Sequence, residues 1–429
     1  MPKVSVIIPV WNLWNMTAAC LRSLAEHNAG AACLEVLVVD NGSDDATGEQ
    51  LPVLGRELFG GNFKGLRLPR NMGFAVACNA GARKAGGDLL LFLNNDTILS
   101  PDWLPPLIAS MEKPGTGATG PLLLYPAGPS DPDGGIQHCG IAVSPFRRLW
   151  HIYEHFPAGH PLPRKSRPLQ AITGAALMTR RPLFFEVGAF FEEYSNGFED
   201  IDFCCALRER GFKLTLTPQS VVTHYTSSTA GRFDADKRNA ELFSRRRRGQ
   251  IKPDLHLLAA ADGYRLRLGV NLNCWLEPTP EREQTLADTA DSRIKAGARA
   301  ETVLSDALTE EPLWLNGRLR LIDLLEAGGR RREALSAALA AFDFFPLPQM
   351  HIRIARLGRQ EGITEDLAPV LERLAEASES RPEDFRPLVQ TVRREAYRDS
   401  DMILAGIVND WLTRYAAGPG NPYGGLRLK

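Results

Sequence analysis

Short, mainly apolar runs bounded by turn residues alternate with helical patterns along the first hundred residues. Consecutive apolar and β-branched residues of this length are typical of strands buried in a parallel sheet. Helical spacing of apolar residues follows at Thr17–His27 and again at Phe74–Ala85. This alternation predicts a doubly wound α/β sheet. The runs predicted as strands are Val4–Pro9, Leu34–Val39, Leu66–Leu68 and Leu89–Leu93.

Two of these runs end on acidic residues. Leu34–Val39 stops at Asp40, and Leu89–Leu93 is followed by Asn94-Asn95-Asp96. Ligands of open α/β sheets bind at the carboxyl ends of the strands, so both carboxylates are expected at one ligand edge. One position suits a contact to a base or a sugar hydroxyl, and the other suits a metal.

The middle of the chain has a different pattern. Residues 114–168 are rich in Gly and Pro and predict short strands with a long loop that can cover a ligand. An apolar stretch follows at Ile172–Thr179, a helix at Ile201–Arg210 and a strand at Phe212–Leu216.

Helical periods dominate after about residue 230. Within 281–415, Ala334 and Ala341 are echoed by Ala368 and Ala375, which suggests a repeat of about 34 residues and tetratricopeptide-like hairpins. Alanine-rich helices also produce such echoes by chance, and both interpretations stay open. The predicted domains are an α/β domain over 1–250 and an all-α domain over 251–429.

Composition narrows the class of protein. The 429 residues suggest two or three domains, and the net charge of -1 gives no argument for a nucleic-acid partner. Seven cysteines without a C-x-x-C pair predict reduced, buried thiols. With a strand predicted from residue 4 and no apolar run of about 18 residues, we expect a cytoplasmic protein without a signal peptide or membrane span.

Four consecutive arginines, Arg245–Arg248, form a basic cluster. They could attract anionic lipid head groups or a lipid-diphosphate acceptor, giving a weak peripheral membrane contact. A solvated helix end with a favourable macrodipole interaction is the preferred interpretation.

A series of short motifs runs between residues 3 and 230. They are Val4–Asn12, Val38–Ser43, Arg70–Ala75 with Asn79, Leu93–Asp96, Thr173–Ala176, Gly197–Asp202, and His224-Tyr225 before Ser227-Ser228. In this order they resemble a family 2 glycosyltransferase of the GT-A fold, and most of all its rhamnosyltransferase-like branch. The helical C-terminal part lies outside the resemblance.

The resemblance implies a nucleotide-sugar site. Asp40 would accept a hydrogen bond from N3–H of uracil or thymine, although an Asp in Asp40–Ser43 can also simply cap a turn. Trp11 would cover the base or pack at the strand end, and Gly73 would allow close backbone approach. The other residues implied to bind the nucleotide sugar are Pro9, Val10, Asn12, Asn71, Asn79, Asn94 and Asn95.

A divalent cation is also implied. Mg²⁺ and Mn²⁺ take carboxylate and phosphate oxygens, so Asp96 would ligate the cation together with the diphosphate. His224 is implied as a further ligand and tilts the choice toward Mn²⁺, whereas a structural histidine is the alternative. Asn94 replaces the first carboxylate of the usual D-x-D motif and is a poor metal ligand.

Asp200 is implied as the general base that takes the proton of the acceptor hydroxyl. Its alternative role is the N-cap of the following helix, with Glu199 and Asp202 at the helix terminus. The residues implied to border the acceptor are Thr173, Gly174, Ala175 and Glu199. Gln137, His138 and His151 could also touch the acceptor, but polar loop residues are the preferred interpretation.

The sequence therefore predicts an inverting, metal-dependent glycosyltransferase that uses a UDP- or dTDP-sugar, with rhamnose favoured over a hexose. The expected acceptor is a hydroxyl of a surface glycan, a lipid-linked sugar or a protein, and the helical part would dock the acceptor or a protein partner. A catalytically weak nucleotide-sugar-binding scaffold is the alternative. A nucleotidyltransferase would need a Gly-rich basic loop where Trp11–Trp14 stands.

Overall fold

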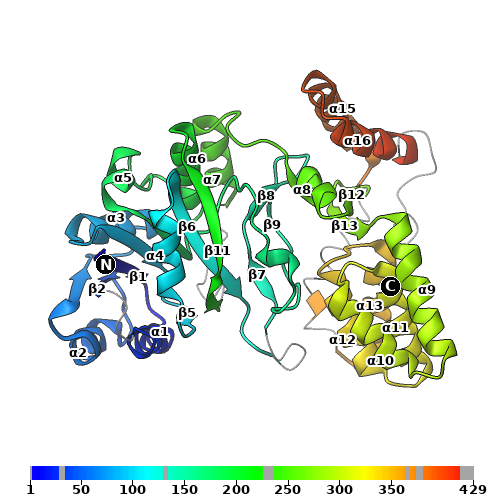
Figure 1. Ribbon diagram of the computed structural model, residues 1–429, viewed down its shortest axis with the longest axis horizontal. Coiled ribbons are helices and arrows are strands. Elements are labelled where there is room, and N and C mark those ends of the chain that lie inside the picture. Colours follow the sequence, from blue (N-terminus) through cyan, green and yellow to red (C-terminus); the bar gives the residue numbers. More distant parts are fainter. Residues whose placement is uncertain are drawn as a thin grey trace. The chain divides into compact units, whose positions relative to one another are not determined.

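The computed structural model describes residues 2–28, 34–128, 134–225, 236–363, 367–368, 370, 372 and 380–415. It divides into two compact units, Met1–Ala142 with Leu149–Lys252, and Val143–Arg148 with Pro253–Lys429 (Figure 1). Each unit is described by itself. Ser227 and Ser228 of the last motif lie outside the described residues, as does Cys33. The other cysteines are buried, and no disulfide joins any of them.

The first unit is built on a nine-stranded sheet in the order β3-β2-β1-β4-β10-β6-β11-β5, with β7 beside β6. Strands β3, β2, β1 and β4 run parallel, β10 is antiparallel to both neighbours, and β6 and β11 are parallel again. This mixed, mostly parallel sheet confirms the predicted α/β class. The strands are β1 (Val4–Val10), β2 (Leu34–Asp40), β3 (Phe63–Arg67), β4 (Leu89–Leu93), β5 (Thr97–Leu99), β6 (Thr116–Leu124), β7 (Ile136–His138), β10 (Ala176–Arg180) and β11 (Lys213–His224).

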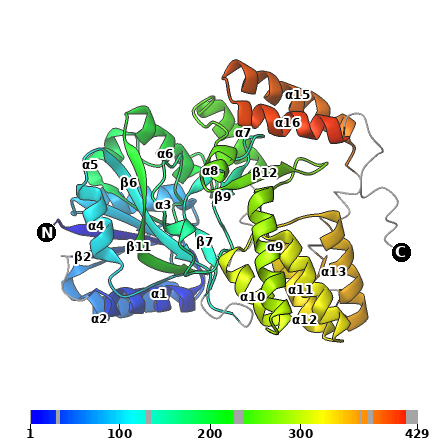
Figure 2. The same ribbon diagram turned by 45° about the vertical axis from the view of Figure 1, so that its right-hand side comes forward.

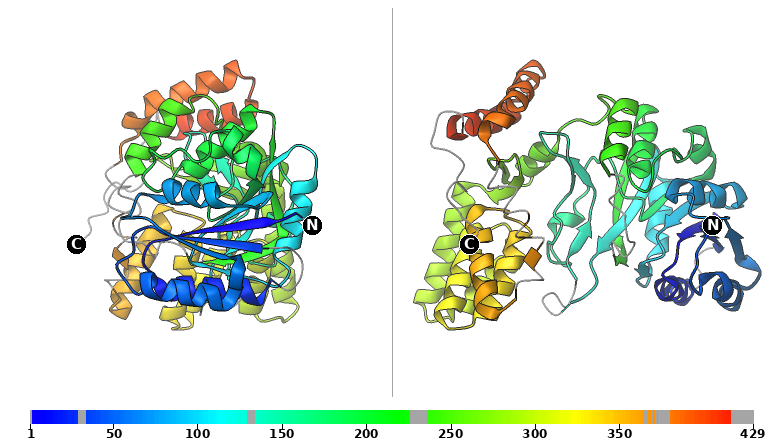
Figure 3. Two further views of the ribbon diagram at one scale, coloured as in Figure 1. Left: turned by 90° about the vertical axis from the view of Figure 1, so that its left-hand side faces the viewer. Right: turned by 180° about the vertical axis from the view of Figure 1, so that it is seen from behind.

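Helices cover both faces of this sheet because its central strands carry buried, mainly apolar residues on both faces (Figure 3). Val6 and Ile8 of β1 belong to one core cluster with residues of α1, α2 and α4. Ile7 faces the opposite side, where a Cβ on Gly81 of α3 would lie 2.6 Å from it. The helices are α1 (Trp14–Glu26), α2 (Thr47–Phe59), α3 (Phe74–Lys84), α4 (Leu104–Glu112), α5 (Arg181–Glu186), α6 (Glu199–Glu209) and α7 (Asp236–Arg246).

Two elements differ from the prediction. Helix α2 was not expected, because Pro52 and two glycines weaken its helical signal. Strand β6 lies in the Gly/Pro-rich segment for which only short strands and a loop were expected, yet its nine residues are largely buried in the sheet. Its Gly117 is needed for packing, since a Cβ there would approach the Cβ of Phe212 to 2.7 Å. The smaller elements are η1 (Gly60–Asn62), β8 (Ile141–Val143), β9 (Leu149–His151) and η2 (Leu162–Arg164).

The second unit is mainly helical, and each helix from α9 to α13 packs against the next (Figure 2). Helices α9, α11 and α13 begin about 34 residues apart, a spacing typical of tetratricopeptide hairpins. The alanine echo was the wrong signal, because Ala334 and Ala341 are buried whereas Ala368 is exposed and Ala375 lies outside the described residues. The helices are α8 (Leu255–Ala261), α9 (Pro280–Lys295), α10 (Ala300–Glu310), α11 (Leu315–Ala327), α12 (Arg331–Phe342), α13 (Pro348–Glu361), α15 (Pro382–Arg398) and α16 (Met402–Tyr415).

A two-stranded antiparallel sheet, β12 (Tyr264–Leu268) with β13 (Cys274–Pro278), adds strands to the part predicted to be all-α. Its signal is a short period-two pattern, in which Tyr264, Leu266 and Leu268 are buried and the arginines between them are half-exposed. Within the described part of the chain, we find no helix whose length and apolar character would let it cross a membrane.

Candidate functional site

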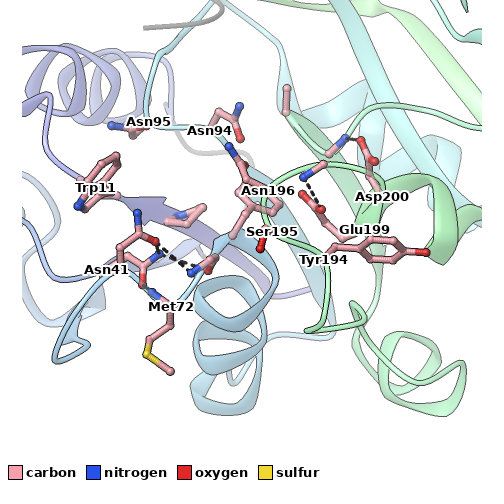
Figure 4. Close-up of a pocket in the computed structure, with 18 of the residues that line it drawn as sticks. Trp11, Asn41, Met72, Asn94, Asn95, Tyr194, Ser195, Asn196, Glu199 and Asp200 are labelled. Carbon is pink, nitrogen blue, oxygen red and sulfur yellow. Dashed lines mark hydrogen bonds between the residues drawn. The ribbon is translucent and has the colours of Figure 1, made fainter. Parts of the chain in front are cut away.

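A cavity of about 670 Å³ opens at the carboxyl ends of β1 and β4 in the first unit. Figure 4 shows Trp11 and Asn41 on one side of it and Glu199 and Asp200 on the other. The structure brings most of the predicted site residues together here. Those that line the cavity are Pro9, Val10, Trp11, Asn71, Gly73, Asn94, Asn95, Asp96, Thr173, Gly174, Ala175, Glu199 and Asp200.

Four predicted residues, Asn12, Asp40, Asn79 and His224, are not part of this lining. Asp40 is buried, and its carboxylate pairs with Arg67 Nη1 at 3.0 Å and accepts a hydrogen bond from the Ser43 amide at 2.8 Å. The amide of Asn12 donates to the Ser43 hydroxyl. Asp40 and Asn12 therefore organise the turn after β2.

Asn79 lies on α3 and fixes a neighbouring loop. Its amide nitrogen donates to the Phe190 carbonyl at 2.8 Å and to the Glu192 carboxylate at 2.9 Å, and its amide oxygen accepts from the Phe190 amide. The loop after Phe190 supplies lining residues that the sequence interpretation missed, because this run has no periodic pattern. They are Glu192, Tyr194, Ser195 and Asn196.

Asn41 also escaped prediction as a binding residue, although its motif was noted. Its side chain donates to Asn71 Oδ1 at 3.0 Å and to the Gly73 carbonyl at 3.2 Å, and it accepts from the Met72 amide at 2.9 Å. Asn41 therefore holds the loop before α3 against the end of β2. Asn41, Asn71, Met72 and Gly73 all line the cavity. Gly73 adopts a φ of 92°, which favours glycine at this turn.

Asp96 and His224 lie side by side, with 3.1 Å between Asp96 Oδ1 and His224 Nε2. The sheet register produces this contact, because β11 pairs with β5 so that His224 lies opposite Thr97. Both side chains are buried. A carboxylate and an imidazole are ligands that Mn²⁺ accepts. In the described part of the chain no group of three or more His, Cys, Asp or Glu side chains forms a metal cluster, so these two fit a cation completed by other ligands.

Gln137 and His138 are not the polar loop residues that were expected. Both are buried strand residues of β7. His138 Nδ1 lies 3.1 Å from His151 Nδ1, and its Nε2 accepts the Thr173 amide at 3.3 Å. Gln137 contacts His224 directly. These residues therefore form a layer behind the segment predicted to border the acceptor.

Asp200 is held by two backbone amides. Its Oδ2 accepts from Gly174 at 2.7 Å and its Oδ1 from Ile201 at 2.8 Å. The alternative role as N-cap is wrong, since Phe198 occupies that position and Asp200 lies inside the first turn of α6. Burial raises the pKa of the Asp200 carboxyl above its ordinary value of 3.8, against the opposing effect of these hydrogen bonds.

Asp202 serves the packing of α6 against α7. It is 2% exposed and binds Arg247 through both carboxylate oxygens at 2.8 Å, while Arg246 Nε lies 2.9 Å away. The guanidinium of Arg246 also lies 3.8 Å from the centre of the Phe191 ring. The preferred interpretation of Arg245–Arg248 as a solvated helix end is therefore wrong for Arg247, whose side chain is 9% exposed.

The comparisons with known proteins agree with this arrangement. The model of "Glycosyl transferase family 2" matches residues 5–210. "Uncharacterized protein y4gI" of Sinorhizobium fredii is 31% identical over 246 residues, 56% of this chain and 26% of that protein. "O-antigen biosynthesis protein RfbC" of Myxococcus xanthus is 29% identical over 236 residues, 53% of this chain and 18% of that protein.

A third relative is "N-acetylglucosaminyl-diphospho-decaprenol L-rhamnosyltransferase" of Mycobacterium tuberculosis, 28% identical over 225 residues, 47% of this chain and 70% of that protein. The chain spans about a quarter of the length of the first relative and less than a fifth of the second. The matched region contains every cavity-lining residue and most of the sheet, but not β11. Over residues 5–210, just under half of its length, this chain is therefore similar to glycosyl transferase family 2.

Proposed function

We propose that this protein is an inverting, metal-dependent glycosyltransferase that moves a sugar from a nucleoside diphosphate to a hydroxyl group. The observation that carries the proposal is the grouping of two carboxylates, Asp200 and Asp96, at one cavity, with His224 in contact with Asp96. One end of such a cavity suits the charged diphosphate, and the other suits the hydroxyl that attacks the sugar.

On the donor side, Trp11 and Asn71 offer an aromatic face and an amide to the nucleotide, and Gly73 lines the cavity without a side chain. We propose that Asp40 contacts N3–H of the base, a proposal supported by Asn41, its neighbour in the chain, which lines the cavity. Asp96 and His224 would hold the divalent cation, Mn²⁺ or Mg²⁺. When bound, the cation supplies positive charge that stabilises the departing diphosphate.

On the acceptor side, Asp200 takes the proton of the attacking hydroxyl. A carboxylate acts best as a base when its pKa lies closer to the working pH, and burial raises the pKa of Asp200. The amides of Gly174 and Ile201 fix the orientation of this carboxylate. Thr173, Gly174, Ala175 and Glu199 would surround the acceptor.

The names of the relatives support a class of substrates. One is named for O-antigen biosynthesis and another for transfer of L-rhamnose to a diphospho-decaprenol-linked sugar. We propose dTDP-rhamnose as the first donor to test and UDP-hexoses as the second, with a surface glycan, a lipid-linked sugar or a protein as acceptor. The helical unit would dock the acceptor or a protein partner.

The test is a thermal-shift panel of UDP, dTDP, GDP, CDP and ADP, each with and without Mn²⁺ or Mg²⁺. Binding to the native state raises the melting temperature. We expect a metal-dependent rise with UDP or dTDP that disappears in Asp96→Ala and persists in Glu112→Ala, a control at the exposed end of α4. No shift with any nucleotide would overturn the proposal and favour the scaffold alternative.

A further inference from the structure

Gln137 makes two hydrogen bonds to a single residue, His224. Its Nε2 donates to the backbone carbonyl of His224 at 2.8 Å, and its Oε1 lies 2.7 Å from the ring nitrogen Nδ1. Gln137 is 3% exposed, at the centre of β7, and His224 is the last residue of β11. The two residues are 87 positions apart in the sequence, so only the fold brings them together.

These two contacts require a proton on Nδ1 of His224. A backbone carbonyl only accepts, so the side-chain NH₂ of Gln137 must face it. The amide oxygen of Gln137 then faces Nδ1 and also only accepts, which requires Nδ1 to be the donor. In the neutral imidazole the lone pair is therefore on Nε2.

The Nε2 atom faces the predicted cation position. It lies 3.1 Å from Asp96 Oδ1 and 3.2 Å from the side-chain amide nitrogen of Asn94. Asn94 and Asp96 line the cavity, whereas His224 and Gln137 are not part of its lining. Gln137 therefore acts on the cavity only through the orientation of His224.

We propose that Gln137 is a positioning residue for the divalent cation, which it serves by fixing the His224 ring with the Nε2 lone pair toward Asp96. This inference rests on the proposed function, in which Asp96 and His224 hold the cation. Groups that orient a metal-bound histidine through its second nitrogen commonly affect metal affinity 10- to 100-fold. Gln137 adds the bond to the backbone of His224, so it fixes the end of β11 as well as the ring.

The first experiment measures Mn²⁺ binding to the full-length protein, from the free-ion signal in electron paramagnetic resonance. Gln137→Met keeps the length of the side chain and removes both hydrogen bonds, and we expect affinity for Mn²⁺ to fall about 10- to 100-fold. Gln137→Glu keeps an acceptor for Nδ1–H, so we expect it to bind Mn²⁺ more tightly than Gln137→Met.

Gln170 provides a matched control. It is also a buried glutamine whose amide makes two bonds to one residue, Lys252, donating to its carbonyl at 2.6 Å and accepting from its amide at 3.0 Å. Gln170→Met removes an equivalent pair of bonds away from the histidine. We expect it to bind Mn²⁺ as the wild type does.

The second readout needs no metal. In protein labelled with ¹⁵N-histidine, we expect His224 to carry its proton on Nδ1, with its signals identified by their absence in His224→Asn. The Gln137→Met variant should lose this preference. A wild-type His224 protonated on Nε2 alone would overturn the inference even if Gln137→Met failed to fold.

The outcomes separate this inference from the proposed function. If the wild type binds Mn²⁺ and Gln137→Met binds it equally well, Gln137 is only structural and the inference fails while the cation site stands. If the wild type does not bind Mn²⁺ but binds nucleotides, the proposed cation site is wrong, and the inference that rests on it is wrong as well. Weaker binding in Gln137→Met, unchanged binding in Gln170→Met and an Nδ1–H wild type support the inference together.

Discussion

Asp200 and Asp202 lie in the same turn of α6, and their partners give them different chemistry. Asp200 accepts hydrogen bonds from the amides of Gly174 and Ile201, and its burial raises the pKa of its carboxyl. Asp202 instead binds the guanidinium of Arg247 through both oxygens. Asp202 therefore serves as an ion-pair partner of Arg247, whereas a desolvated carboxylate such as Asp200 binds a proton more readily.

The first prediction concerns the pH dependence of transfer. Asp200 acts in its deprotonated form, so kcat/KM should rise with pH through the pKa of this carboxyl in the free enzyme. Because burial raises that pKa, the acidic limb should lie above pH 3.8, the ordinary value for Asp. Asp200→Asn removes the proton acceptor and should lower kcat about 100-fold or more. A steady-state pH profile checks both, and an active Asp200→Asn enzyme would contradict them.

The second prediction concerns stability and uses Asp202. Asp202→Asn leaves Arg247 buried without its main counter-charge, so we expect a loss of about 3 kcal/mol in the free energy of unfolding. The matched control is Glu209→Gln, which removes a carboxylate 2.9 Å from the same arginine but 48% exposed. Glu209→Gln should lower the free energy of unfolding by less than about 1 kcal/mol. Urea titrations measure both, and equal losses would count against the buried pair.

At the residue scale, the sequence indicates the groups that belong to local motifs. Asp96 follows a strand, and Asp200 lies in the first turn of a helix. Their positions relative to the sheet edge therefore follow from the pattern of elements. The contact between Gln137 and His224 joins β7 to β11 and has no local signature. Glu192 and Asn196 lie in a run without period, where residue types alone do not indicate which side chains face a cavity.

At the scale of elements, Glu35 joins the first strands of the sheet at the end away from the cavity. It lies on β2, and its carboxylate accepts from the Ser5 hydroxyl of β1 at 2.6 Å and from Lys64 of β3 at 2.5 Å. It also accepts from the Gly86 amide before β4, at 2.7 Å. One buried carboxylate therefore fixes the relative positions of four strands whose other ends carry the site.

The third prediction follows from this cluster. Burial by itself would raise the pKa of Glu35, but hydrogen bonds from Lys64, Ser5 and Gly86 outweigh it and lower the pKa from 4.5 to about 2. A pKa lower in the folded state stabilises the protein above pH 4.5, and this stabilisation is lost as the pH falls toward 2. The shift corresponds to at most about 3 kcal/mol at neutral pH.

Glu35→Gln should therefore lower the free energy of unfolding by about 2 kcal/mol at pH 7, and the difference from wild type should shrink below pH 4.5. Urea titrations at pH 7 and at pH 3 check the two parts of this expectation. A difference that is the same at both pH values would show that the hydrogen-bonded charge is not the source of the stability.

The elements that the sequence predicted correctly have strong, uninterrupted patterns. β1, β2 and β4 are runs of buried apolar residues, and α3 has a regular apolar face. Helix α2 was missed because Pro52 has a low helix propensity, and the length of β6 was underestimated because its glycines have a low strand propensity. In both elements, packing in the fold overrides the local propensity. The hairpin of β12 and β13 was missed because its strands are short and the sequence around them has helical periodicity.

At the scale of the whole molecule, the second unit is not continuous in sequence. It takes in residues 143–148 from the middle of the first half of the chain. Val143 exchanges hydrogen bonds with Asp254, since its amide donates to the carboxylate at 2.8 Å and its carbonyl accepts from the amide at 3.0 Å. Arg148 reaches Asn273 at 3.3 Å. The predicted boundary near residue 250 came from a change of pattern along the chain. Such a boundary cannot show that residues 143–148 belong to the second unit.

The last prediction is that the two units cannot be separated cleanly at Lys252. A fragment of residues 1–252 lacks Asp254 and Asn273, and so leaves the amide of Val143 and the guanidinium of Arg148 without these partners. A fragment of residues 1–279 restores both.

Each missing bond lowers the free energy of unfolding by about 1 kcal/mol, and for a chain of this size each kcal/mol lowers the melting temperature by about 2–4 °C. Melting of the two fragments by circular dichroism compares them directly, with Asp254→Ala in the longer fragment as the control that removes the side-chain bond to Val143 and keeps Asn273. We expect the short fragment to melt lowest and the Asp254→Ala variant to lie between the two. Equal melting temperatures for both fragments would mean that the contacts of residues 143–148 with Asp254 and Asn273 contribute nothing to stability, and that a cut at Lys252 leaves the first unit intact.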